Sequence, residues 1–188
     1  MFVAKLPPFT QQGMLPPGDY PLTFLELRQS ILVGQATIGW DGTWRKALVN
    51  QCEIMVNQLW QVGVTEIFLD GSFVEEKSHP NDIDGYFECD LMQLASGDLQ
   101  RQLNALDPHK VWTWDPNSRR AYRGDPKKQL PMWHRYRTEL YPHVGQPSGI
   151  QDSLGHQLTF PSAFRQQRNT HAPKGVIKIL KDSGGGQA

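Results

Sequence analysis

The chain has 188 residues, which is enough for one domain with a hydrophobic core and short for two. Its 19 basic and 19 acidic residues cancel, which argues against a nucleic-acid coat protein and against binding of acidic ligands through overall charge. Two cysteines exclude a disulfide framework and a thiolate zinc cluster, and no run of about 18 apolar residues is present to cross a membrane.

Residues 1–20 predict an extended N-terminal arm, because four prolines and two glycines prevent a regular helix there. The start of the arm lacks the apolar run of a signal peptide, so we expect a cytoplasmic protein with no membrane partner. A first helix is predicted from Thr23, its N-cap, with Glu26 at the capping-box spacing. A longer helix is predicted over residues 43–62, where apolar residues recur every three or four positions, and it ends at Gly63.

The rest of the chain mixes short strands and helices. Residues 64–70 predict a buried strand and residues 82–89 a second one. This mixture predicts an α+β (α/β) fold, a small mixed β-sheet flanked by helices, with one domain over residues 21–181 and a flexible tail over 182–188. The other predicted elements are a helix at 96–106, strands at 111–114 and 135–144, a short helix at 161–168 and a strand at 175–180.

The segment IFLDGSFVEEKSHPNDIDGYF contains a strand, a Gly-Ser turn and an Asp-Ile-Asp sequence. Asp82 and Asp84 are two positions apart on a predicted strand, so both carboxylates point to one face and can approach hard divalent cations together. Gly71 lets backbone N–H groups come close to phosphate oxygens, and Ser72 adds a hydroxyl donor. Lys77 would add a positive charge at the outer phosphate. The segment therefore predicts a metal-assisted nucleotide site.

A second interpretation of this segment is a β-hairpin whose tip is polar because it is solvated, with Pro80, Asn81 and Asp82 forming a turn. An acid-x-acid pair alone carries no signal, because chance produces about two in a chain of this length. The signal is the combination of an apolar strand, Gly-Ser at its end, the gap, and two carboxylates entering a second strand.

These residues resemble the signature of the DNA polymerase β-like nucleotidyltransferase superfamily. More of the chain resembles a group of small bacterial proteins in that superfamily. The resemblance implies a small mixed sheet flanked by helices, and transfer of a nucleotidyl group from an NTP with Mg²⁺ or Mn²⁺. The matching motifs are Leu15-Pro16-Pro17-Gly18, Asp70-Gly71-Ser72-Phe73-Val74, Pro80-Asn81-Asp82-Ile83-Asp84 and Pro173-Lys174-Gly175-Val176-Ile177.

The same resemblance implies a third carboxylate on a later strand, and Glu139 is the candidate. A second interpretation makes Glu139 an exposed acid on an amphipathic strand. If the three carboxylates assemble, Asp84 and Glu139 would share the metal ion on the nucleophile side during in-line attack on an α-phosphate. Two positions depart from the superfamily pattern, since Asp70 and Gly85 stand where apolar residues are usual.

Residues 110–137 interleave aromatic and basic side chains, a composition suited to phosphates and stacked bases, or to a core with a solvated basic surface. Two hypotheses remain open. One is a metal-dependent nucleotidyltransferase acting on a nucleic-acid, protein or small hydroxyl acceptor. The other is a non-catalytic nucleotide- or partner-binding module, for example half of a toxin–antitoxin or phage-defence pair. They differ in whether Glu139 stands within metal reach of Asp82 and Asp84.

Overall fold

The computed structural model describes residues 6–35 and 38–182. A five-stranded mixed sheet in the order β1-β9-β2-β3-β6 organises the fold and confirms the predicted α+β class. The β1–β9 and β3–β6 pairs are parallel, and β2 is antiparallel to both of its neighbours. The strands are β1 (Asp19–Leu22), β9 (Val176–Ile179), β2 (Ile67–Asp70), β3 (Ile83–Glu88) and β6 (Thr138–His143).

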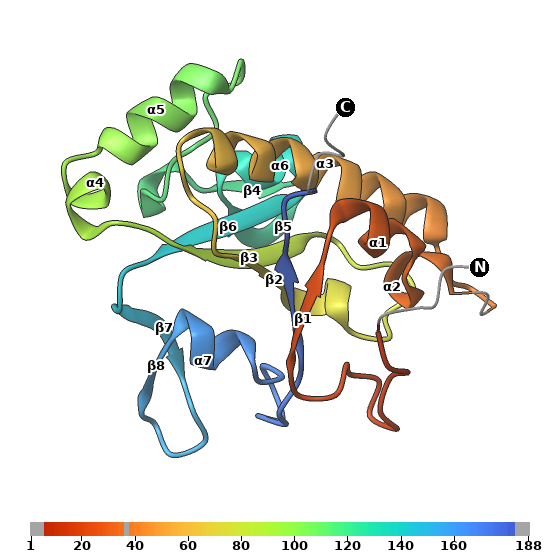
Figure 1. Ribbon diagram of the computed structural model, residues 1–188. Helices are drawn as coiled ribbons and strands as arrows, with labels where there is room; N and C mark the ends of the chain where they lie inside the picture. Colours follow the sequence, from red (N-terminus) through yellow and green to blue (C-terminus); the bar gives the residue numbers. More distant parts are fainter. Residues whose placement is uncertain (1–5, 36–37, 183–188) are drawn as a thin grey trace.

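Helices cover the two faces of the sheet unequally (Figure 1). The long helix α3 lies on one face with α1, α2, α5 and α6, whereas α7 and the β7–β8 hairpin lie on the other. The helices are α1 (Phe24–Gln29), α2 (Ile31–Gly34), α3 (Gly42–Gln61), α4 (Leu91–Ala95), α5 (Asp98–Leu106), α6 (Pro131–Tyr136) and α7 (Phe160–Phe164). The described elements also include two short 3-10 helices, η1 (Gly71–Val74) and η2 (Pro116–Ser118). Two hairpins complete them, β4 (Arg120–Tyr122) with β5 (Asp125–Gln129) and β7 (Pro147–Gln151) with β8 (Gln157–Thr159).

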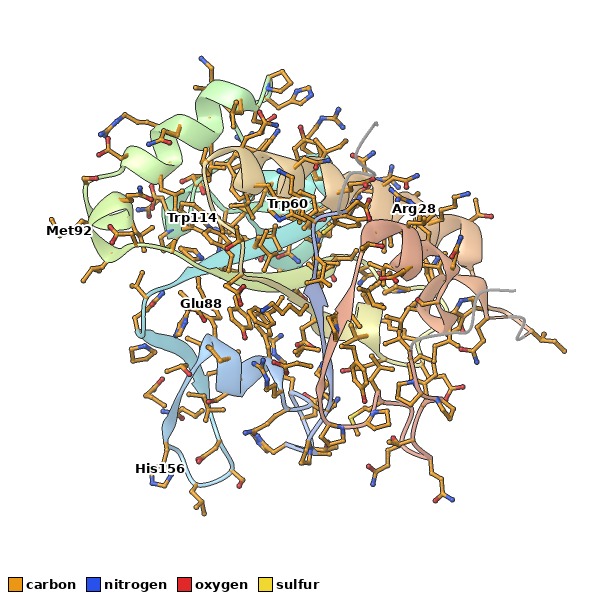
Figure 2. All side chains as sticks on the ribbon, in the orientation of Figure 1. Arg28, Trp60, Glu88, Met92, Trp114 and His156 are labelled. Atoms are coloured by element: carbon orange, nitrogen blue, oxygen red, sulfur yellow. The ribbon has the colours of Figure 1, made fainter. Side chains whose placement is uncertain are left out.

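The strands present different side chains to the two faces. Leu69, Phe87 and Leu140 pack with α3 in the main core. Alternate residues point the other way, where Phe68 and Tyr86 stack at 4.8 Å under α7 in a second cluster. Figure 2 shows Trp114 on the α3 side and Glu88 on the opposite side. We call the side opposite α3 the open face, because α7 is the helix that covers part of it.

Several local predictions are confirmed. The Thr23 hydroxyl accepts from the Glu26 N–H at 3.2 Å and the Glu26 carboxylate accepts from the Thr23 N–H at 2.9 Å, which is the capping box. The helix it starts ends at Ser30, which caps α2 in turn. The helix predicted over 43–62 is α3, and the strands predicted around the Gly-Ser turn are β2 and β3.

One predicted strand is absent, and another is confirmed with a later start. Residues 111–114 form no strand, because Trp112 bonds through its backbone to Asn104 and through its ring to Gln58 instead of to a neighbouring strand. The strand predicted over 135–144 starts too early. Pro131 begins α6, which extends to Tyr136, and Arg137 ends it with a left-handed φ of 51° before β6 starts.

The segment predicted as an arm packs on the body of the fold where it is described. Leu15 is fully buried and its carbonyl accepts from the N–H of Gly175 at 3.0 Å. Strand β1 starts at Asp19, so the sheet includes the end of that segment. Residues 1–5 and most of the predicted tail, 183–188, lie outside the described residues. Among the described helices, none combines the length and apolar composition needed to span a bilayer.

Candidate functional site

Three carboxylates from three neighbouring strands form one row across the open face. Asp84 of β3 is in register with Asp70 of β2 on one side and with Glu139 of β6 on the other. Residues paired in this way point to the same face of a sheet. We call Asp70, Asp84 and Glu139 the acid row. Asp82 lies one residue before β3, and its negative charge acts on Asp84.

The acid row concentrates negative charge around Asp84. Burial, together with the negative charges of Asp82, Glu139 and Asp70, raises the pKa of Asp84 to about 8. Lys127 of β5 opposes this effect. A carboxyl group in such surroundings ionises at neutral pH only when a cation balances it, so the row is a place for positive charge.

Asp82 and Glu139 are each fixed by neighbours from the segment 110–137. The indole N–H of Trp133 donates to Oδ2 of Asp82 at 2.6 Å. Glu139, only 4% exposed, accepts from the Leu130 N–H at 2.8 Å and from the Tyr141 hydroxyl, and lies 3.5 Å from Arg119. The interpretation of Glu139 as an exposed surface acid is therefore wrong.

The carboxylates fit a hard divalent cation by residue type, since Asp and Glu oxygens are its usual ligands. They do not converge on one point as they stand, and among the described residues no three acidic, histidine or cysteine side chains could hold a metal ion. Other groups hold them apart: Oδ2 of Asp82 accepts from Trp133, and both oxygens of Glu139 accept hydrogen bonds. Coordination requires these two carboxylates to turn toward Asp84.

The Gly-Ser turn lies directly against the acid row. Gly71 begins η1 with φ +76°, and a Cβ atom there would come within 2.6 Å of Oδ2 of Asp84. Ser72 follows as a half-buried residue, at the surface of the same turn. Lys77 is exposed. The lysine whose charge acts on Asp84 is instead Lys127, on strand β5. Asp82 is 8% exposed, which does not agree with a solvated hairpin tip.

A buried lysine fixes this turn from below. The Nζ of Lys174 donates to the Gly71 carbonyl at 3.3 Å and to Oε1 of Glu75 at 2.9 Å. It also lies 3.0 Å from Oδ1 of Asp70, as an ion pair without hydrogen-bond geometry. Burial raises the pKa of Asp70 to about 7 despite the opposing charge of Lys174. Lys174 thus connects the turn to one end of the acid row.

A buried arginine fixes the turn and the loop after it from α3. Arg45 is fully buried, and burial lowers its pKa to about 9. Its guanidinium donates to the carbonyls of Leu32, Phe73 and, at 2.7 Å, Lys77. The backbone between the Gly-Ser turn and Asp82 is therefore tied to the first turn of α3.

Sequence reasoning did not identify Arg45, Lys127 or Trp133 as part of the site, and it placed Asp70 outside the pattern. The signal for Trp133 and Lys127 was the basic, aromatic composition of residues 110–137, which borders the acid row in the structure. For Arg45 the sequence holds no signal, because a basic residue in the first turn of an amphipathic helix is ordinarily exposed.

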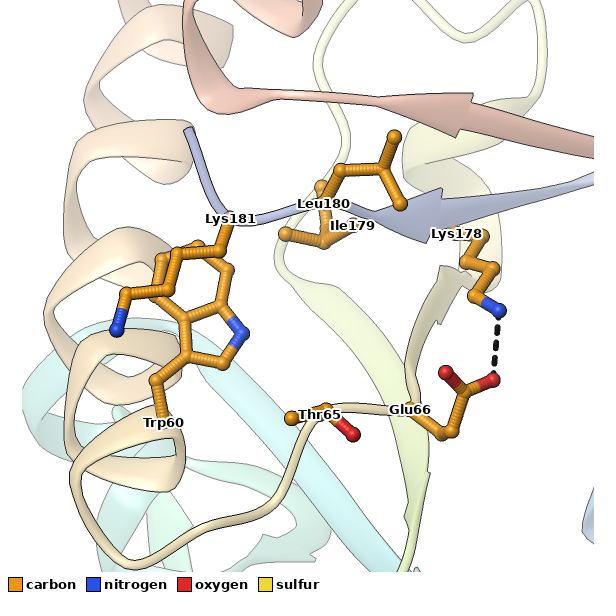
Figure 3. Close-up of a pocket in the computed structure, with 7 residues that line it drawn as sticks. All are labelled: Trp60, Thr65, Glu66, Lys178, Ile179, Leu180 and Lys181. Atoms are coloured by element: carbon orange, nitrogen blue, oxygen red, sulfur yellow. Dashed lines mark hydrogen bonds and ion pairs between the residues drawn. The ribbon is translucent and has the colours of Figure 1, made fainter. Parts of the chain in front are cut away.

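A separate hollow of about 250 Å³ lies at the other end of the sheet (Figure 3). Trp60 forms one wall, and the ion pair between Lys178 and Glu66, 2.6 Å apart, forms another. None of the predicted site residues lines it. Its lining combines Trp60, Thr65 and two aliphatic residues with the Lys178–Glu66 pair and Lys181, and it adds nothing to the acid row.

Comparison with known proteins concerns the chain as a whole. No curated protein and no solved structure matches it. A family model does match, over residues 7–180, which include the acid row, the Gly-Ser turn and Lys174. The chain belongs to the family described as a family of unknown function, DUF6932.

Proposed function

We propose that the chain is a metal-dependent nucleotidyltransferase that transfers a nucleotidyl group from an NTP to a hydroxyl acceptor. The observation that carries the proposal is the acid row with Asp82, packed against the Gly71–Ser72 turn. The negative charge gathered around Asp84 favours a divalent cation, and the turn beside it would hold the phosphates that the cation would bridge.

In this proposal Asp82, Asp84 and Glu139 hold Mg²⁺ or Mn²⁺, and the turn with Ser72 binds the phosphates. The metal supplies charge neutralisation for the triphosphate and lowers the pKa of the attacking hydroxyl. The hydroxyl oxygen would attack the α-phosphorus as its proton passes to water. The bond from the α-phosphorus to the bridging oxygen would break, and pyrophosphate would leave. Lys77, which is exposed on the loop after the turn, would add a positive charge at the outer phosphate. Because NTPs are supplied inside the cell, the same proposal places the protein in the cytoplasm.

The experiment is thermal unfolding with each of the four NTPs and Mg²⁺ or Mn²⁺. A ligand at about a hundred times its dissociation constant adds roughly 2.7 kcal/mol, or about 5–10 °C in a domain of this size. We expect a metal-dependent shift in the parent and in Glu76→Gln, which removes an exposed carboxylate from the same loop. The shift should be absent in the double variant Asp82→Asn, Asp84→Asn.

Absence of a shift with every NTP would contradict the proposal. The hydrogen bonds that hold Asp82 and Glu139 away from Asp84 would then be structural contacts, with no metal to replace them. The chain would be a non-catalytic, partner-binding module of the same fold, and a search for its protein partner would follow.

A further inference from the structure

The hairpin β4–β5 and helix α6 carry a dense positive charge beside the acid row. Residues 119–137 contain seven of the 19 basic residues and one acid. Among the side chains that the structure describes, the exposed Arg120, Arg123, Lys128 and Arg135 form no ion pair with a carboxylate. We call the hairpin surface the set Arg120, Tyr122, Arg123, Lys128, Arg135 and Arg137.

Aromatic rings are interleaved with these cations. The guanidinium of Arg137 lies 4.2 Å from the ring centre of Tyr122 and 3.9 Å from that of Trp133. Arg123 lies 5.1 Å from the Tyr122 ring. Guanidinium groups and aromatic rings in this arrangement offer flat surfaces to stacked bases and charges to phosphates.

The hairpin surface is continuous with the acid row. Tyr122 packs edge-on against Trp133 at 5.2 Å, and Trp133 bonds directly to Asp82. Two further cations of the same segment act on the row, Lys127 on Asp84 and Arg119 on Glu139. The end of a polyanion bound to the hairpin surface would therefore lie near Asp82 and the acid row.

We infer that the hairpin surface binds a single-stranded nucleic acid and that, resting on the proposed function, this strand is the acceptor whose terminal hydroxyl reaches the acid row. Repeated cations match a repeated phosphate charge, which a small acceptor lacks. The stacked Tyr122 and Arg137 match unpaired bases, which a duplex does not offer.

The test is fluorescence anisotropy of a labelled 20-nucleotide single strand, as RNA and as DNA, in EDTA and without NTP. Arg123→Ala with Lys128→Ala should weaken binding at least about tenfold and reduce the slope of log K against log salt by about 1.4, the effect of two lost phosphate contacts. The control, Lys46→Ala with Lys181→Ala, removes two exposed lysines outside residues 110–137 and should bind as the parent does. Tyr122→Leu should weaken binding at least about fivefold, whereas Tyr122→Phe retains it.

No binding by the parent, an equal loss in the control, or equal binding of a duplex would overturn the inference. The assay contains neither metal nor NTP, so its result is independent of the nucleotide site. Binding of the strand without any NTP shift would leave the hairpin surface standing and remove the proposed function. A thermal shift with NTP but no strand binding would support the proposed function and overturn the inference about the hairpin surface.

Discussion

A Cβ atom at Gly71 would lie 2.6 Å from Oδ2 of Asp84, so the Gly-Ser turn and the acid row touch at one position. Gly71 also has φ +76°, a conformation that side chains disfavour. Glycine is required there twice, for the backbone conformation and for the approach of the carboxylate. The two halves of the proposed site, one for phosphates and one for metal, therefore depend on the same residue.

Gly71→Ala should destabilise the protein and abolish any NTP shift. The methyl group has to displace the turn or the Asp84 carboxylate, in addition to the strain of positive φ, which together cost about 2–4 kcal/mol. Gly63→Ala is the matched control, because Gly63 has φ +87° and open space around its Cα. It should cost about 1 kcal/mol in urea denaturation. Equal losses in the two variants would show that contact with Asp84 does not matter.

Asp84→Asn should stabilise the protein in the absence of metal. The variant replaces a buried carboxyl group, surrounded by Asp82, Asp70 and Glu139, with a neutral amide of similar shape. We expect a gain of about 1–3 kcal/mol in the free energy of unfolding at neutral pH, seen as a higher melting temperature. Glu76→Gln, which removes an exposed charge, should change it by less than about 0.5 kcal/mol. A destabilised Asp84→Asn would mean that the carboxyl group serves the fold rather than a ligand.

The stability of the parent in EDTA should fall as pH rises from about 4 to about 8. Burial raises the pKa of Asp84 to about 8 and that of Asp70 to about 7, above the usual 3.8. In this range the folded state keeps protons that the unfolded state has released, so the free energy of unfolding decreases with pH. Melting temperatures of the parent and Asp84→Asn, measured across this range, should diverge as pH rises. Parallel curves would contradict the raised pKa of Asp84.

The parts of the fold that were predictable from sequence are those set by local rules. The capping box at Thr23 and the apolar period of α3 act within a few residues, so they could be recognised without tertiary structure. Strand β1 could not be recognised from the sequence, because it has only four residues and pairs with β9 (Val176–Ile179), more than 150 residues away. The early start predicted for β6 has the same origin, since Pro131 and Arg137 decide where α6 replaces it.

The candidate site also contains residues that local sequence predicts and residues that only tertiary structure brings together. Gly71, Ser72, Asp82 and Asp84 lie in one segment, and their spacing predicted that the turn and the carboxylates lie together, as Gly71 and Asp84 do. Glu139 is brought to Asp84 by parallel pairing of β3 with β6, which no local pattern encodes, and it was identified by resemblance. Burial of charge is also set by tertiary packing, which is why Lys174 looked in the sequence like one more surface cation.

Lys174→Met should destabilise the protein by about 3–5 kcal/mol, because it leaves the buried carboxylate of Asp70 and the half-buried carboxylate of Glu75 without a cation. Lys178→Met is the matched control. It removes a lysine from the adjacent strand whose ion pair with Glu66 is about a third to a half exposed, and such pairs contribute less than about 1 kcal/mol.

A second variant, Asp70→Asn in the Lys174→Met background, identifies the cause of the destabilisation by Lys174→Met. If the loss comes from an uncompensated charge on Asp70, neutralising it recovers part of the stability, and the two changes are non-additive in a double-mutant cycle by about 1 kcal/mol or more. If the stability is instead lost because the Lys174 alkyl chain or its hydrogen bond to the Gly71 carbonyl is removed, Asp70→Asn adds its own destabilisation. In that case the coupling energy of the double-mutant cycle is near zero. Urea denaturation of the four proteins measures this. Additive effects would leave Lys174 as a packing residue, whereas coupling makes it the cation that permits the buried carboxylate of Asp70 at the end of the acid row.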